Sequence, residues 1–188
     1  MNPNPVILTR SGIIFYGLLF VVALIVAKMA GVLDQWLPQG GLPWFVQILG
    51  GSFVGMTGVW LSRFTEARVL AVRQLALDFS QLLRGLSRGQ AWILALVSGI
   101  AEEALFRGTL QPLLGLLPTT VLFAVVHVGP SRRYLWWTAS ALLYGLVLGL
   151  LFEWGMGLLA PVAAHVTLNA VNLYNLAQRP VMPRMWAE

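Results

Sequence analysis

Long apolar stretches recur along this chain of 188 residues. Five of them contain no Asp, Glu, Lys or Arg and cover residues 11–27, 35–62, 108–131, 134–152 and 154–178. A sixth, residues 91–107, is equally apolar except for two glutamates and one arginine. Each is near or above the roughly 20 residues that cross a bilayer as an α-helix. The pattern predicts an all-α fold, a polytopic membrane helix bundle of about six spans.

Residues 63–90 have a different pattern, in which five arginines alternate with leucine and phenylalanine. This mixture is typical of an amphipathic helix that lies at the membrane interface, although a short buried helix would show it too. Elsewhere, Gly51 and Gly55, and again Gly145 and Gly149, are one helical turn apart. Such pairs of small residues favour close helix packing in membranes.

Proline and glycine divide the segment between the glutamates and residue 134. Residues 108–117 form a short connection, Pro118 restarts the chain, and the next helix is expected to run through Phe123 to His127 and to stop at Gly129 and Pro130. The last span is expected over residues 156–178. No internal repeat or low-complexity tract is visible.

Composition supports the membrane prediction. The chain is 58% hydrophobic and 10% charged, with a mean hydropathy of +0.77, which is too apolar for a soluble domain. We expect one integral-membrane domain over residues 1–188. The apolar run at residues 13–27 lacks a cleavage pattern after it and is interpreted as a retained first helix.

The net charge of +5 predicts membrane orientation and not nucleic-acid binding. If the chain has six spans and its N-terminus is in the cytoplasm, almost all lysines and arginines of the loops fall on the cytoplasmic side. Residues 63–90 and the C-terminus are therefore expected in the cytoplasm, facing lipid headgroups. The exceptions are Lys28 and Arg107. The chain has no cysteine, which excludes disulfides, thiolate chemistry and cysteine-bound metals.

Glu102 and Glu103 are the most unusual residues, because an ionised carboxylate inside a membrane is costly and is functional by default. Arg107 follows Glu103 by four residues, so these two are expected to pair on one helix face. Glu102 points about 100° away and remains free of that arginine. We expect a structural Glu103 and a chemical Glu102, with a purely structural polar clamp as the alternative.

The chain has two histidines, and both lie inside apolar stretches. Phe123 precedes His127 by one turn and is expected to stack under its imidazole. His165, Asn169 and Asn172 follow one another at one-turn spacings and form a polar stripe. A single histidine on an apolar helix is more often a core residue than a ligand, but two beside a glutamate pair favour a site.

These groups could together add water to a carbonyl. A carboxylate and an imidazole can deprotonate one water, while a second imidazole and an amide stabilise the oxyanion. No Gly-x-Ser-x-Gly elbow or His-Glu-x-x-His helix is present. Glu102, His127 and His165 could also be three metal ligands. Because neither histidine has a carboxylate one turn away, we expect no metal and no other cofactor.

Three segments resemble known motifs. Residues 102–107, 123–127 and 165–169 resemble, in order, the Glu-Glu-x-x-x-Arg, Phe-x-x-x-His and His-x-x-x-Asn motifs of the CAAX-protease and bacteriocin-processing (CPBP, or Abi) family of intramembrane endopeptidases. The resemblance covers a catalytic core within residues 91–175. Family members usually have about eight spans, two more than the pattern predicts here.

The resemblance implies an intramembrane glutamic-type protease in a bacterial inner membrane, acting on a membrane-associated peptide or protein. Glu102 would be the water-activating base and His127 its partner, and His165 with Asn169 would stabilise the oxyanion. Glu103 and Arg107 would be the supporting ion pair, with Phe123 and Asn172 nearby. Two alternatives remain open: a non-catalytic scaffold that binds a membrane-protein partner, and a proton-coupled carrier.

Overall fold

The computed structural model describes residues 4–38 and 42–180, and these residues form helices with no strand among them. The α-helices are α1 (Pro5–Ala30), α2 (Trp44–Arg68), α3 (Leu70–Leu82), α4 (Arg88–Leu105), α5 (Gln111–Leu114), α6 (Leu116–Val125), α7 (Leu135–Leu151) and α8 (Leu159–Ala177). Four short helical turns complete the set: η1 (Leu33–Trp36), η2 (Phe106–Leu110), η3 (Arg132–Tyr134) and η4 (Phe152–Met156). The predicted all-α fold is confirmed for these residues.

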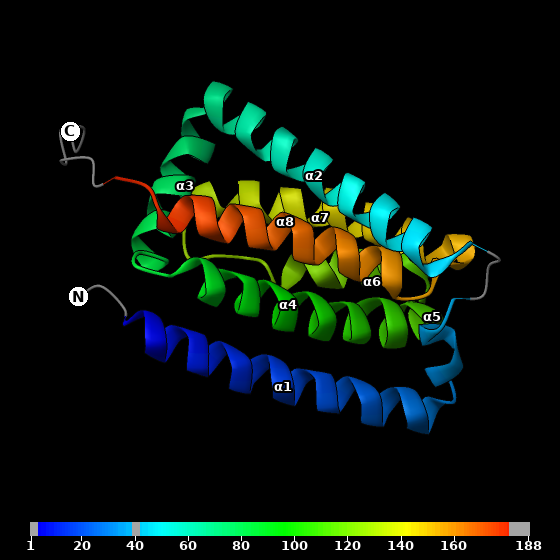
Figure 1. The fold of residues 1–188 in the computed structure, drawn as a ribbon. Helices are drawn as coiled ribbons and strands as arrows, with labels where there is room; N and C mark the ends of the chain where they lie inside the picture. The colour runs from blue at the N-terminus through cyan, green and yellow to red at the C-terminus, as the bar shows by residue number, and fades with distance from the viewer. Residues whose placement is uncertain (1–3, 39–41, 181–188) are drawn as a thin grey trace.

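The long helices lie side by side in one bundle (Figure 1). α4 packs between α1 and α8, and α8 packs in turn against α2. α6 and α7 pair with each other and approach α8 through α7. This order puts α4, which carries both glutamates, in the interior of the bundle.

Three helical stretches are long and apolar enough to cross a membrane by length and composition: Pro5–Ala30, Trp44–Arg68 and Arg132–Met156. Large apolar side chains on α1 and α2, such as Phe15 and Phe53, are exposed, which suits lipid better than water. α6 is a shorter apolar helix. The count of six spans therefore stays a prediction.

The amphipathic helix predicted over residues 63–90 is confirmed only as the shorter α3, and its predicted bounds are wrong. α2 continues to Arg68, and the extended backbone of Val69 (φ −114°, ψ 112°) separates it from α3. α3 has 13 residues, too few for the about 30 Å of a hydrocarbon core. Ser87 then caps α4 through a reciprocal pair of hydrogen bonds with Gln90. These chain breaks, which the arginine pattern does not show, divide the segment among three helices.

The chain between the glutamates and His127 also differs from the expectation. The α4 helix does not end near Gly108, because η2 is one wide π-helical turn that carries it on into α5. The chain reverses at Gly115, whose φ of +88° favours glycine. α6 then begins before Pro118, which is tolerated in a first turn, and ends at Val125. His127 consequently lies just beyond the helix and not inside it.

The two pairs of glycines permit close contact, as predicted. A side chain at Gly51 or Gly55 would press against the backbone oxygens of Ala160 and Ala164, so α2 and α8 touch along this line. Gly145 and Gly149 on α7 instead accommodate two polar side chains, Arg107 and Gln111. The second pair therefore belongs to the polar interior of the bundle.

Candidate functional site

The two adjacent glutamates lie in the last turn of α4 and have different exposures. The Glu103 side chain is 0% exposed, whereas the Glu102 side chain is 12% exposed. A buried carboxylate is tolerated only when hydrogen bonds and opposite charge compensate for its lost hydration. The partners of each glutamate therefore indicate what it does.

Glu103 is held by two cationic or hydrogen-bonding groups on the same oxygen. Arg107 Nη1 donates to Glu103 Oε1 at 2.9 Å, and His165 Nδ1 lies 2.7 Å from that oxygen. Arg107 Nη2 donates to the backbone oxygen of Gly145 at 2.9 Å, which ties η2 to α7. The predicted Glu103–Arg107 pair is confirmed, and it is joined by His165, which sequence spacing did not pair with Glu103.

Glu102 faces both histidines without touching either. Its Oε2 lies 3.8 Å from His127 Nε2 and 4.0 Å from His165 Nε2. These separations exceed direct hydrogen-bond length and suit groups that share a bridging water or a reacting atom. Residues from α4, from the segment after α6 and from α8 thus converge on one small volume.

The orientation of each imidazole is fixed through its other nitrogen. His127 Nδ1 lies 2.6 Å from the backbone oxygen of Phe123, and His165 Nδ1 lies against the Glu103 carboxylate. Both partners are acceptors, so Nδ1 carries the proton in each ring. Each Nε2 is left to face Glu102, free to accept a proton or, in the imidazolium form, to donate one.

Phe123 forms the apolar floor of this group. Its ring centroid is 4.5 Å from that of His127 and 6.2 Å from that of His165. The Arg107 guanidinium lies over the same ring, 4.3 Å from the centroid, in a cation–π contact. The predicted stacking of Phe123 under His127 is confirmed, and the aromatic ring also shields the buried ion pair.

The asparagines are placed differently from one another. Asn169 Nδ2 donates to Ser98 Oγ at 3.1 Å, and Ser98 is one turn before Glu102 on α4. Asn169 and His165 on α8 therefore run alongside Ser98 and Glu102 in antiparallel register. Asn172 is half-buried, and within the described residues no hydrogen bond joins it to this group.

Two aromatic residues at the site escaped the sequence reasoning. Tyr16 on α1 lies beside Glu102, close enough for its phenol to interact with the carboxylate. Trp137 on α7 packs edge-on against His127, with ring centroids 5.1 Å apart. Both residues lie in apolar stretches, and periodicity alone does not distinguish them from aromatic residues that face lipid. For Tyr16, the register of α1 against α4 and η2 makes that distinction, because Gly12 meets Leu94 and Ala23 meets Thr109.

The wide turn of η2 follows directly after the glutamates and is supported from α1 and η1. Trp36 Nε1 donates to the backbone oxygen of Gly108 at 2.9 Å. The Thr109 hydroxyl lies 2.8 Å from Ala104 O and 3.2 Å from Ala23 O and donates to one of them at a time. π-helical turns are rare and frequent at functional sites. Here the turn carries Arg107.

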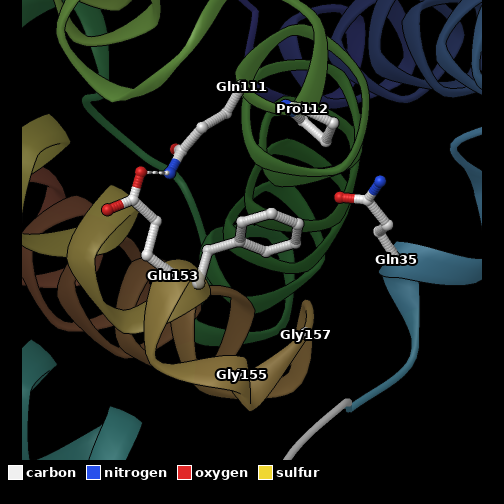
Figure 2. Close-up of a pocket in the computed structure, with 7 residues that line it drawn as sticks. Gln35, Gln111, Pro112, Glu153, Gly155 and Gly157 are labelled. Carbon is white, nitrogen blue, oxygen red and sulfur yellow. Dashed lines mark hydrogen bonds between the residues drawn. The ribbon is translucent and has the colours of Figure 1, made fainter.

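A separate cavity of about 290 Å³ lies at the end of the bundle formed by η1, α5 and η4. Figure 2 shows Gln111 and Glu153 pointing toward each other at one side of this cavity and Gln35 at the other, and Gln111 Nε2 donates to Glu153 Oε1 at 3.3 Å. Gln111 also donates to Gly149 O at 3.0 Å, one turn on from the contact of Arg107 with Gly145. None of the predicted site residues lines this cavity.

Glu102 Oε2, His127 Nε2 and His165 Nε2 converge, and from the sequence these three residues could also be metal ligands. In residues 4–38 and 42–180, no three histidine or acidic side chains are arranged to hold a metal ion. The geometry itself suits activation of a water that is placed between the Glu102 carboxylate and the imidazoles.

Comparison with known proteins points to the same segment. Residues 85–171 match the family described as type II CAAX prenyl endopeptidase Rce1-like. An uncharacterized protein of Bacillus subtilis (strain 168), YpbD, is 36% identical over 78 residues, which are 42% of this chain and 41% of that protein. The alignment thus spans about two-fifths of the relative's length. No solved structure matches.

The matched residues include Glu102, His127, His165 and Asn169. The resemblance to the CPBP family, inferred from three motifs, is therefore confirmed for residues 85–171. Asn172 lies just outside the match. Together with the three apolar helices, this similarity indicates an integral membrane protein that resembles CAAX-type proteases over residues 85–171.

Proposed function

We propose that this chain, whose residues 85–171 are similar to the Rce1-like type II CAAX prenyl endopeptidase family, is an intramembrane endopeptidase of the glutamic type. One observation carries the proposal. Glu102 Oε2 lies 3.8 Å and 4.0 Å from the free nitrogens of His127 and His165. A water between these atoms can be deprotonated and aimed at a peptide carbonyl.

Glu102 and His127 form the base side of the site. Both side chains are partly exposed, at 12% and 16%, so water and a substrate can reach them. Glu102 takes a proton from the water as its oxygen attacks the scissile carbonyl. His127 Nε2 orients that water, because its Nδ1 is already committed to the Phe123 oxygen.

His165 and Asn169 form the oxyanion side. The Glu103 carboxylate stabilises His165 as an imidazolium through Nδ1, so that Nε2 can donate to the developing oxyanion. Asn169 supplies a further amide N–H from the next turn of α8, because Ser98 engages only one of its two. When the tetrahedral intermediate collapses, the proton held by Glu102 passes to the leaving amine.

The substrate on this proposal is a peptide bond of a membrane-associated protein or peptide. The chain would act as a multi-pass protein of a bacterial inner membrane, with residues 63–90 and the C-terminus in the cytoplasm. Residues 181–188 lie outside the described residues, so the placement of the C-terminus remains a sequence prediction. A cysteine introduced at Ser80 and labelled in intact cells with an impermeant reagent would test the orientation.

The activity can be tested with purified chain in proteoliposomes. Two probes are suitable: a farnesylated quenched-fluorescence peptide that ends in a CAAX sequence, and a mixture of unmodified transmembrane peptides followed by mass spectrometry. We expect cleavage by the parent, and a loss of about 10²–10⁴-fold in Glu102→Gln and in His127→Ala. Trp92→Phe, a change on an exposed part of α4, is the control.

Three outcomes separate the alternatives. Parent-like cleavage by Glu102→Gln would exclude this mechanism. A folded parent that cuts neither probe but co-purifies with one membrane protein in stoichiometric amounts would favour the scaffold. Loss of cleavage in a strong chelator, restored by added zinc, would make His127 and His165 metal ligands. We expect cleavage to survive chelation.

A further inference from the structure

A second cavity, of about 380 Å³, lies at the opposite end of the bundle from η4. Its volume falls in the lower part of the about 300–1,000 Å³ range of ligand pockets. The end of α2, the start of α3 and the end of α8 meet there (Figure 1). The lining residues are polar or charged with one exception, and they are Arg63, Glu66, Ala67, Arg73, Asn175 and Arg179.

The charges in this cavity do not balance. Arg179 Nη2 binds Glu66 Oε2 at 2.6 Å, which neutralises one arginine. Arg63 and Arg73 have no acidic partner within 4 Å among the described residues. Arg73 is instead held in place by a hydrogen bond of 3.3 Å from its Nη2 to Ala67 O. Two positive charges are therefore left over beside one cavity.

The uncharged lining residue adds a further donor. Asn175 Nδ2 is buried, and no acceptor among the described residues binds it. Two unpaired guanidinium groups and a free amide N–H make a site rich in donors and poor in acceptors. An anion with several oxygens, such as a phosphate, fits that requirement, and arginine binds phosphate oxygens in bidentate fashion.

The surroundings indicate where such a phosphate comes from. The cavity opens at the end of α2, one of the helices that can cross a membrane. The last turns of α2 expose large apolar side chains, Trp60, Leu61 and Phe64. A phospholipid can therefore place its headgroup among the arginines and its acyl chains along α2. Arginines at this level of a membrane protein attract anionic lipids.

We propose that the pocket between α2, α3 and α8 binds the phosphate of an anionic phospholipid headgroup. The site lies apart from Glu102 and the histidines, and it does not depend on the proposed peptidase activity. Bound lipid would hold the ends of three helices together, including α8, which carries His165.

The test uses the purified full chain in detergent, titrated with short-chain phosphatidylglycerol and counted by native mass spectrometry. Phosphatidylcholine tests the need for net negative charge, and inorganic phosphate tests whether a free anion competes. The variants are Arg63→Gln and Arg73→Gln, and Arg88→Gln is the matched control. Arg88 begins α4 at the same end of the bundle but does not line the cavity.

We expect phosphatidylglycerol to bind more tightly than phosphatidylcholine, and each pocket variant to weaken it about fivefold while Arg88→Gln leaves it unchanged. Circular dichroism and gel filtration establish that the variants are folded. Displacement of phosphatidylglycerol by millimolar inorganic phosphate would support an anion site in this pocket, but would make free phosphate its ligand in place of the lipid. Equal binding of the two lipids, or an equal loss in Arg88→Gln, would overturn the proposal.

Discussion

Glu102 and Glu103 are neighbours in the chain but occupy two different environments. Glu103 is wholly buried and has partners at 2.7 Å and 2.9 Å, His165 and Arg107. Glu102 is 12% exposed, and its nearest basic groups lie at 3.8 Å and 4.0 Å. The first carboxylate holds helices together through one oxygen, Oε1, which both partners contact. The Glu102 carboxylate lies near two imidazoles with which it can exchange protons, but it forms no direct hydrogen bond with either.

The histidines show the same division. His165 is 6% exposed and is anchored to the buried carboxylate, whereas His127 is 16% exposed and is anchored to a backbone oxygen. Burial and direct pairing therefore mark the supporting half of the site, and partial exposure marks the reactive half. Substitutions of Glu103 and Arg107 should affect stability first, those of Glu102 and His127 should affect turnover, and His165, which joins the two halves, should affect both.

The largest effect on stability is expected for Arg107→Ala. This change removes the arginine that pairs with Glu103 in the interior, and breaking a buried ion pair from one side costs about 3–5 kcal/mol. We expect a low yield of monodisperse protein and a lowered unfolding midpoint in detergent. Glu103→Gln, which keeps a hydrogen-bonding group, should be milder, and Glu102→Gln should unfold like the parent.

Equal and parent-like midpoints for Arg107→Ala and Glu102→Gln would remove the distinction between the two halves, because Arg107 would then be solvated. The position of Arg107 makes this outcome unexpected. Its side chain is 1% exposed and is enclosed by Phe123, Glu103 and the backbone of Gly145.

A smaller effect is expected where α7 approaches this pair. A Cβ at Gly145 would lie 2.9 Å from Phe123 Cδ1 and 3.3 Å from Arg107 Nη2. Overpacking of this kind typically costs about 1–3 kcal/mol. Gly145→Ala should therefore lower the unfolding midpoint. Gly17→Ala on α1 is the control, since no atom lies within 4 Å of its added Cβ, and it should be neutral or slightly stabilising.

The smallest effect is expected on the reactive side, at Tyr16. The phenol of Tyr16 lies beside the Glu102 carboxylate, and we expect it to help position that group through a hydrogen bond, which is typically worth about 0.5–1.5 kcal/mol. Tyr16→Phe should lower kcat severalfold with KM and the unfolding midpoint nearly unchanged. Tyr174→Phe on α8 should leave both constants as they are. A loss of stability with unchanged kcat would make Tyr16 a packing residue only.

Sequence reasoning was most successful where a contact is local to one helix. The pairing of Glu103 with Arg107 and the stacking of Phe123 on His127 follow from a four-residue spacing. α7 and α8 end within a few residues of their predicted bounds, because hydrophobic runs mark them well. The number of membrane spans could not be predicted from the apolar stretches, because such stretches do not show whether a helix crosses the membrane or lies within the bundle.

Contacts between distant segments were predicted only in part. The motif order indicated that Glu102, His127 and His165 belong together, but not that Glu103 would hold His165. Residues 63–90 were misread, because Val69 and Ser87 break the helix through backbone geometry and capping and not through polarity. Tyr16 and Trp137 were missed because their roles depend on how α1 and α7 sit against the site.

The wide turn at residues 106–110 amounts to one extra residue inserted into an otherwise regular helix. An α-helix advances by about 100° per residue, so deleting one position here would rotate everything beyond it by that angle. Gln111 would then leave Gly149, and the indole of Trp36 would face a different carbonyl. The glutamates, which precede the turn, would stay in register with α8. The insertion therefore sets the directions in which Gln111 and the Trp36 contact face without changing the register of the glutamates on α8.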